Sequence, residues 1–327
     1  MTKLKKIWVG LLTKNISDAG SKTGFVLIVN DGGNVDSLHA SFGKKSVQSN
    51  HLSRGEAGIY SRDLKSSGFN SGTGIIDPKK LSDSSVRIGI RGDDEWRPQH
   101  GLIWGQDENE TIIPIAMEED ISVKLSTDSQ EGKISLPLRR VRPGKKDTRI
   151  RRLLLMVETQ QQSFPGAENP DPIRFETGTN DPIKLVVKNK SGTILVNHEI
   201  SDTPQSDLEP GNDNFYIIPV ISSFAKKDLN ANSIVLSILG NDSWLPGKMF
   251  LFGLDTASGR PSNIIPLVHI DSWKDGRMSK DTEDGAGSIT SKPSVTLKLL
   301  SDKESFGFTK DTIAQPPPFG GGGLIGG

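Results

Sequence analysis

The sequence predicts an all-β protein made of two tandem antiparallel β-sandwich domains and a Pro/Gly-rich C-terminal tail. Short apolar runs alternate with turn residues about every 8–12 positions, which is typical of antiparallel sandwiches. No long stretch places apolar residues at helical spacing, so long amphipathic helices are not expected. The main landmarks occur twice in the same order, and 327 residues suit two domains of about 150 residues each.

A turn that carries a Trp and a Pro is the clearest landmark. It occurs as Arg91-Gly-Asp-Asp-Glu-Trp96-Arg-Pro98 and again as Leu239-Gly-Asn-Asp-Ser-Trp244-Leu-Pro246. Apolar runs flank both copies, at 86–90 and 101–105 and at 234–238 and 249–253. This pattern indicates a hairpin-like unit written twice. The indoles of Trp96 and Trp244 either pack under their turns as core or stand at the tip as contacts for a lipid surface.

The remaining strands follow the same duplicated order. We expect them at 7–12, 25–29, 75–76, 111–115 and 121–125 in the first copy and at 153–157, 183–187 and 295–299 in the second. Leu52 to Gly55 recurs as Leu208 to Gly211, and Ile112-Ile-Pro114 recurs as Ile264-Ile-Pro266. We therefore assign sandwiches to 1–138 and 153–314, a basic linker to 139–152 and the tail to 315–327, with the boundary near Pro143-Gly144.

Composition excludes several classes of function. The 40 basic and 40 acidic residues balance, which makes nucleic acid an unlikely partner. The absence of cysteine excludes disulfides, thiolate zinc sites and cysteine nucleophiles. The apolar run at 7–12 is too short for a signal peptide or a transmembrane helix, so we expect a cytoplasmic protein or one exported without a cleaved signal.

The predicted linker is strongly basic. It contains one acidic residue and eight basic ones: Arg139, Arg140, Arg142, Lys145, Lys146, Arg149, Arg151 and Arg152. One interpretation is a contact with anionic lipid or another anion. The other is a solvated linker, or a strand edge protected by charge. The sequence leaves both open and favours the second.

The tail combines apolar side chains with a Pro/Gly backbone. Pro316-Pro-Pro318 favours an extended conformation, and Phe319, Leu324 and Ile325 follow on a glycine carrier. A spacer needs no large apolar side chains. We therefore predict a segment that docks into a partner, another copy or a different subunit, through Phe319, Leu324 and Ile325.

Each copy resembles a PLAT (LH2) domain, an eight-stranded β-sandwich. In the second copy, Gly178-Thr-Asn-Asp181, Leu208-Glu-Pro-Gly211-Asn-Asp213-Asn-Phe215 and Asp242-Ser-Trp244 match the family's turns and closing strand. The first copy departs from the pattern, because Gly20-Ser-Lys-Thr23 has no acidic residue and Gly55-Glu-Ala-Gly-Ile59 lacks the Asp and the Phe. The resemblance implies a module that binds membranes, lipids or partner proteins, sometimes with calcium.

The resemblance also suggests a calcium site in the second copy. Calcium takes oxygen ligands from carboxylates and carbonyls on loops. If the family topology holds, Asn180, Asp181, Asp213 and Asp242 could converge at one end of the sandwich. The alternative, which we favour, is turn chemistry, since Asn and Asp also bond their own backbone in turns.

The sequence gives little support for catalysis. The histidines have no metal-ligand spacing, and no nucleophile elbow or phosphate-binding loop is present. We therefore predict no catalytic residues and no enzyme activity, with a hydrolase as a minor alternative. The expected function is a structural or interaction protein that acts as a scaffold or docking module in a larger assembly. The main alternative is a peripheral lipid-binding module, which calcium could assist.

Overall fold

The computed structural model describes residues 3–33, 36–42, 52–64, 74–92, 94–160, 177–201, 208–281 and 291–307. The first domain consists of two four-stranded antiparallel layers, β7-β6-β1-β4 and β3-β2-β5-β8, and the first layer is part of a nine-stranded sheet, β7-β6-β1-β4-β13-β10-β15-β16-β9, that continues into the second domain. Their strands are β1 Leu4–Thr13, β2 Phe25–Val29, β3 Leu38–Phe42, β4 Ala57–Asp63, β5 Val86–Ile90, β6 Pro98–Asp107, β7 Ile112–Glu118 and β8 Ser135–Pro137.

The second domain repeats this arrangement with sheets β13-β10-β15-β16 and β12-β11-β14-β19. The strands are β10 Arg149–Thr159, β11 Ile183–Lys188, β12 Ile194–Ile200, β13 Asp213–Ala225, β14 Ile234–Ile238, β15 Pro246–Asp255, β16 Asn263–Ile270 and β19 Ser294–Thr296. Shorter elements are β9 Arg142–Pro143, η1 Lys226–Asp228, β17 Arg277–Met278, β18 Ser291–Lys292 and α1 Asp302–Phe306. The prediction of an all-β fold with antiparallel sandwiches is confirmed.

The duplication extends to local detail. Trp96 Nε1 donates to Thr13 Oγ1 at 3.0 Å, and Trp244 Nε1 donates to Thr159 Oγ1 at the same distance. The strand β6 shifts register against β7 next to Trp104, and β15 shifts against β16 next to Phe252. Both copies therefore build the same bulge and the same buried indole. The predicted hairpin is wrong, because β5 pairs with β2 and β8 while β6 pairs with β1 and β7, so the Trp turn passes from one sheet to the other.

A glycine with positive φ precedes β4 and β13 in the two copies. Gly55 has φ 77° and Gly211 has φ 80°. A side chain is disfavoured in this left-handed region, so glycine is the residue that closes this turn at low cost. The recurrence of Leu52 to Gly55 as Leu208 to Gly211 in the sequence thus reflects a shared backbone conformation.

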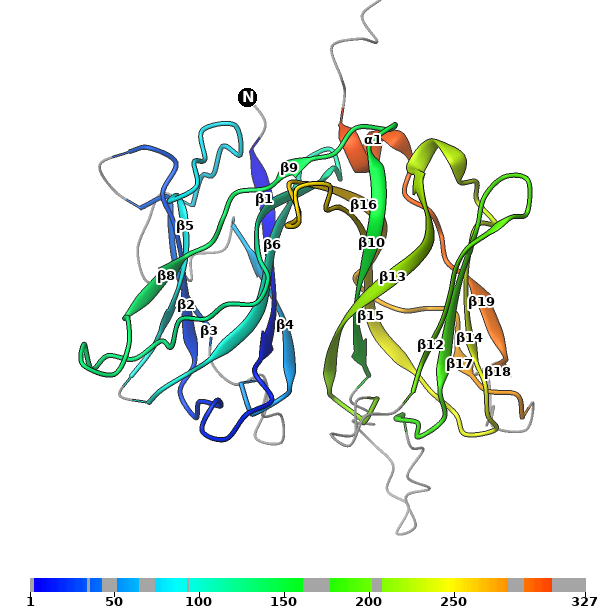
Figure 1. Ribbon diagram of the computed structural model, residues 1–327, viewed down its shortest axis with the longest axis horizontal. Coiled ribbons are helices and arrows are strands. Elements are labelled where there is room, and N and C mark those ends of the chain that lie inside the picture. The colour runs from blue at the N-terminus through cyan, green and yellow to red at the C-terminus, as the bar shows by residue number, and fades with distance from the viewer. Residues whose placement is uncertain are drawn as a thin grey trace, which may run out of the picture.

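The two domains stand side by side as four layers of sheet, with β7-β6-β1-β4 and β13-β10-β15-β16 on the inside (Figure 1). Each domain has a core of its own between its inner and outer sheet. A third apolar core lies between the two inner sheets and takes residues from both domains. We call this third core the seam.

The inner strands are apolar on both faces because both faces are buried. On β1, Val9 packs into the first domain's own core while Trp8 faces the seam. On β10, Leu155 packs into the second domain's core while Leu154 faces the seam. The uninterrupted apolar runs at 7–12 and 153–157 are thus the sequence signature of strands with a core on each side.

The segment 139–152 is part of the fold and does not act as a free linker. Arg140 forms a bridge with Ala116 of β7. The short strand β9 pairs in parallel with β16 of the second domain. On the opposite side of the seam, Asp213 of β13 pairs with Ala57 of β4. The two inner sheets are therefore joined at both edges, and β10 begins at Arg149, inside the segment predicted as a linker.

Candidate functional site at the seam between the domains

The seam is lined by aromatic and aliphatic side chains from both domains. Its buried members are Trp8, Ala57, Ile59, Leu102, Trp104, Ile112, Met117, Val141, Leu154, Met156, Phe215, Phe250, Phe252, Leu254, Ile264 and Leu300. Phe250 of the second domain lies 5.3 Å from Trp8 and 5.2 Å from Trp104, measured between ring centroids. Tilted aromatic contacts at this spacing are favourable beyond the area that they bury.

One glycine on β1 makes room for a side chain of the opposite inner sheet. A Cβ placed on Gly10 of β1 would come within 2.3 Å of the Met156 sulfur on β10, far inside van der Waals contact. Gly10 therefore provides the space that Met156 fills from the opposite domain. A larger residue at this position would force the Met156 side chain to move.

Polar contacts around the rim tie the two domains together. Lys6 Nζ lies 2.8 Å from an oxygen of Asp271, and Arg152 lies 2.8 Å from Glu119. Arg260 lies 3.2 Å from Glu118. Pairs that are partly exposed contribute little free energy, so the apolar contacts of the seam account for most of the attraction between the two sheets.

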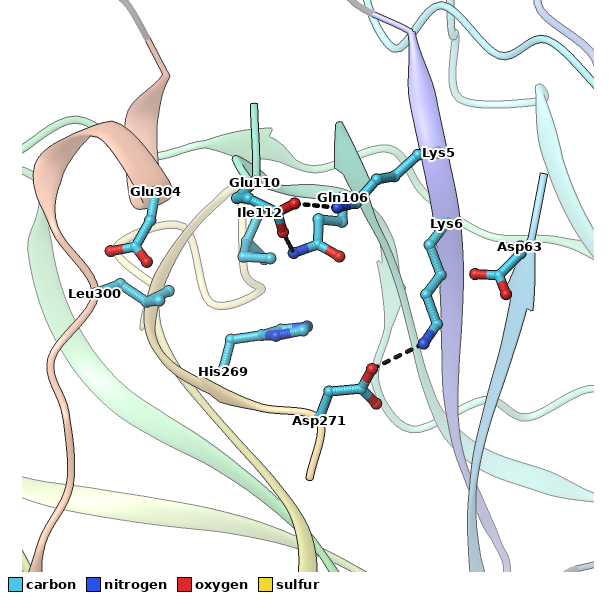
Figure 2. Close-up of a pocket in the computed structure, with 10 residues that line it drawn as sticks. All are labelled: Lys5, Lys6, Asp63, Gln106, Glu110, Ile112, His269, Asp271, Leu300 and Glu304. Carbon is cyan, nitrogen blue, oxygen red and sulfur yellow. Dashed lines mark hydrogen bonds and ion pairs between the residues drawn. The ribbon is translucent and has the colours of Figure 1, made fainter. Parts of the chain in front are cut away.

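A polar cavity of about 570 Å³ opens at one end of the seam (Figure 2). It is lined by Lys5, Lys6, Asp63, Gln106 and Glu110 with Ile112 from the first domain, and by His269, Asp271, Leu300 and Glu304 from the second. We call it the seam cavity. Glu110 bonds to both Lys5 and Gln106, while Lys6 reaches across the cavity to Asp271 (Figure 2).

His269 projects from β16 into this cavity (Figure 2). Its ring lies 5.1 Å from Trp8 and 4.7 Å from Phe250. Burial lowers the pKa of His269 to about 4, with Asp271 acting to raise it and Lys6 to lower it. The imidazole is therefore neutral near pH 7, and it suits packing against aromatic rings better than proton transfer.

We expect His269 to make the protein less stable in acid. Its folded pKa lies below the ordinary value of 6.5, so the unfolded chain binds the proton first. Stability is then complete above about pH 6.5 and is lost as the pH falls toward 4, by about 2 kcal/mol after allowing for partial exposure. The variant His269→Met, which carries the residue found at the equivalent position Met117, should remove this part of the pH dependence.

Urea unfolding of both proteins between pH 4 and pH 7 measures this effect. Comparing them cancels the contribution of other groups, such as Glu56, whose pKa burial raises to about 7. His198→Gln, on β12 of the outer sheet, is the control for the loss of a histidine outside the seam cavity. Equal slopes for wild type and His269→Met would contradict the assignment.

The residues predicted to bind calcium do not act as one cluster. The amide of Asn180 donates to Asp242 at 3.0 Å, and the amide of Asp242 donates to Asp181 at 2.6 Å. These are the turn contacts of the alternative interpretation. Asp213 instead accepts from the amide of Ile59 in the first domain at 2.7 Å. Within the described ranges, no group of three or more His, Asp or Glu residues could hold a metal ion.

The placement of the two turn tryptophans corrects one prediction. Trp96 and Trp244 are both 0% exposed, and each bonds a buried threonine. Neither indole can reach a lipid surface, so the core interpretation holds. The reason is that the turn folds back over the end of the sandwich, where Trp96 bridges to Leu125 and Trp244 to Met278.

Most of the basic segment contacts the protein itself. Arg139 donates to the carbonyl of Pro261, Arg140 to that of Pro78 and Arg149 to that of Ser223. Lys146 pairs with Asp302, Arg151 with Asp255 and Arg152 with Glu119. Arg142 and Lys145 are exposed. The segment thus works chiefly as a connector between the sheets.

The other predicted residues lie apart or outside the described ranges. Phe319, Leu324 and Ile325 of the tail are outside them, as is His51. His100 stacks on Phe215 across the seam, at 5.6 Å between ring centroids. Sequence reasoning missed the seam itself, although the doubly apolar runs at 7–12 and 153–157 carry its signal.

Comparisons with known proteins found no matching family model, curated protein or solved structure. Across the part of the chain that the structure describes, no helix has the length and apolar character needed to cross a membrane.

Proposed function

We propose that this protein is a non-catalytic structural and interaction protein, a scaffold or docking module within a larger assembly. The observation that carries the proposal is the seam, an aromatic core that unites two sandwiches into one block. Interfaces between domains that move are usually more polar than this, because they must open to water. A block of this kind suits the task of holding other subunits at a fixed separation.

The seam cavity supports the same proposal. Its lysines are paired with Glu110 and Asp271, so their charges are satisfied within the protein. Its histidine is neutral and packed against aromatic rings. Groups poised for acid–base chemistry would instead need a pKa near the working pH and a free path to a substrate.

Light scattering during size-exclusion chromatography tests the proposal, with full-length protein and a 1–314 truncation, each alone and mixed with candidate partners. We expect the full-length chain to form complexes that the truncation forms weakly or not at all. Phe319→Ser should resemble the truncation, and Gln315→Ala should resemble wild type. Monomeric behaviour of both chains under every condition would contradict the proposal.

A second candidate function is a peripheral lipid-binding module. The observation that favours it is the exposure of Arg142 and Lys145 in the basic segment. Flotation with anionic and neutral vesicles, with and without calcium, tests it. Binding to anionic vesicles that falls at least about tenfold in Arg142→Glu/Lys145→Glu would support this function, and the absence of vesicle binding would remove it.

A further inference from the structure

A second cavity, of about 310 Å³, lies where the described chain ends. We call it the α1 groove. Its walls include Leu81, Ile113 and Pro114 of the first domain and Val141 of the connecting segment, and Phe306 and Gly307 form one side. Leu81 is 2% and Val141 1% exposed, so these apolar walls are buried, while Lys79, Asp107 and Arg140 add charged groups to the lining. A cavity of this size and lining suits one large apolar side chain with its backbone.

The fold fixes the helix beside this groove in place. Lys226, only 3% exposed, donates to the carbonyl of Ser301 at 3.0 Å, and Lys146 pairs with Asp302 at 2.8 Å. Ser305 Oγ donates to the carbonyl of Pro266 at 2.8 Å. A five-residue helix gains little stability by itself, so these bonds hold α1 on the second domain.

The same contacts fix the point at which the C-terminal segment starts. Gly307 closes α1 with φ 66° and its amide bonds to the carbonyl of Lys303. The site for a Cβ on Gly307 lies 3.5 Å from Thr111, which also lines the groove. The described chain therefore ends at Gly307, beside the groove, and residues 308–327 lie outside the described ranges.

The sequence beyond this point is chemically matched to the groove. Residues 315–327 carry no charge, and their three large apolar side chains are Phe319, Leu324 and Ile325. We propose that the α1 groove is the docking site of the chain's own tail, with Phe319 as the side chain that fills it. The four glycines after Phe319 allow the backbone to lie close to the groove wall.

Chain length and tethering favour the chain's own tail over that of a second copy. From Gly307 to Phe319 the chain can extend about 40 Å, so it can turn back to a groove that begins beside Gly307. A short flexible tether gives an effective concentration on the order of millimolar, far above the concentration of a second copy in a micromolar solution. The intramolecular contact therefore forms first.

This contact would regulate the docking that we propose for the tail. The inference rests on the proposed function in one respect, namely that the tail is the segment that binds partners. Phe319 cannot fill the groove and bind a partner at the same time. The groove thus shields the apolar tail in the free chain and releases it to a partner that binds more tightly. A variant with a blocked groove should then capture partners more readily than wild type.

Methyl NMR with labelled Ile side chains tests the inference on the full-length chain. Ile113 and Ile115 report on the groove, and Ile183 and Ile234 in the second domain's core serve as internal references. We expect the 1–314 truncation and Phe319→Ser to shift the groove signals equally, with Gln315→Ala unchanged. A synthetic peptide of residues 315–327 should restore the signals in the truncation and should bind full-length protein at least about tenfold more weakly.

A pair of charge variants on the groove side completes the test. Ile113→Lys should abolish the response to the tail, whereas Asn109→Lys, on the rim and with the same added charge, should preserve it. Groove signals that are identical in full-length and truncated protein would overturn the inference. Shifts that appear only with concentration-dependent dimerisation would also overturn it, in favour of a second copy's tail. Both of these NMR outcomes concern only the groove. The proposed function is tested separately, by whether the full-length chain forms complexes with partners in chromatography.

Discussion

Replacing Phe250 with Ala is expected to lower the free energy of unfolding by about 3–5 kcal/mol, and the loss should be felt in both domains. Phe250 is fully buried in the seam and contacts Trp8 and Trp104 of the first domain. Its removal leaves a cavity between the inner sheets, and neither sheet can close the cavity without moving the other.

Hydrogen exchange resolved by segment measures the effect. Amides of β2 and β5 in the first domain should lose as much protection as those of β11 and β14 in the second. Ile221→Ala removes an apolar side chain that is 68% exposed on β13, and it should cost less than about 0.5 kcal/mol. Loss of protection confined to the second domain would show that the seam does not couple the two.

Trp244→Ala should also destabilise the protein by about 3–5 kcal/mol. The indole is fully buried in the second domain's own core, and its Nε1 donates to Thr159 at 3.0 Å. Truncation removes the largest side chain under the turn and the partner of a buried hydroxyl group. Because Trp96 makes the same contact with Thr13, Trp96→Ala should cost a similar amount.

Urea unfolding followed by circular dichroism measures both variants. Trp244→Phe keeps most of the packing but loses the hydrogen bond to Thr159. It should lower the free energy of unfolding by about 1–2 kcal/mol relative to wild type. A Trp244→Ala protein that unfolds like wild type but loses a binding activity would restore the interpretation as a surface anchor.

Many elements within each domain could be predicted from the sequence because their signals are local, but the strands predicted at 75–76 and 121–125 are absent from the structure apart from isolated bridges at Leu125. The Trp turn located the flanking strands β5 and β6, and β14 and β15, but the predicted hairpin is wrong because each turn passes from one sheet to the other. The repeat of Leu52 to Gly55 as Leu208 to Gly211 reflects a backbone with positive φ, which few residues other than glycine tolerate. Such features depend on a few neighbouring residues. Their presence in both copies strengthened each prediction.

The seam could not be predicted in the same way. Trp8 and Val9 are equally apolar in sequence, and nothing local shows that one faces its own domain and the other faces the second. The segment 139–152 was predicted as a solvated linker because it is rich in basic residues. Its pairings, Arg140 with Ala116 and β9 with β16, are too short to leave a strand pattern in the sequence. Contacts between distant segments decide both features.

The candidate calcium ligands also show that contacts between distant segments are not predictable from local sequence. Asn180, Asp181 and Asp242 do meet, as their places in adjacent turns suggest. Asp213 follows the turn at Gly211, but it serves the junction between β13 and β4 by accepting from Ile59. Its role depends on the other domain, which the resemblance of a single copy could not reveal.

The central claim is that the seam makes the two sandwiches one rigid block. The chain has no cysteine, so two spin labels can be attached at S84C and N197C without competing sites. Ser84 is exposed in the turn before β5, and Asn197 is exposed on β12, so the labels mark the two outer sheets. Pulsed electron paramagnetic resonance should give one narrow distance distribution in wild type and a broad one in Phe250→Ala. A broad distribution in wild type would contradict the claim.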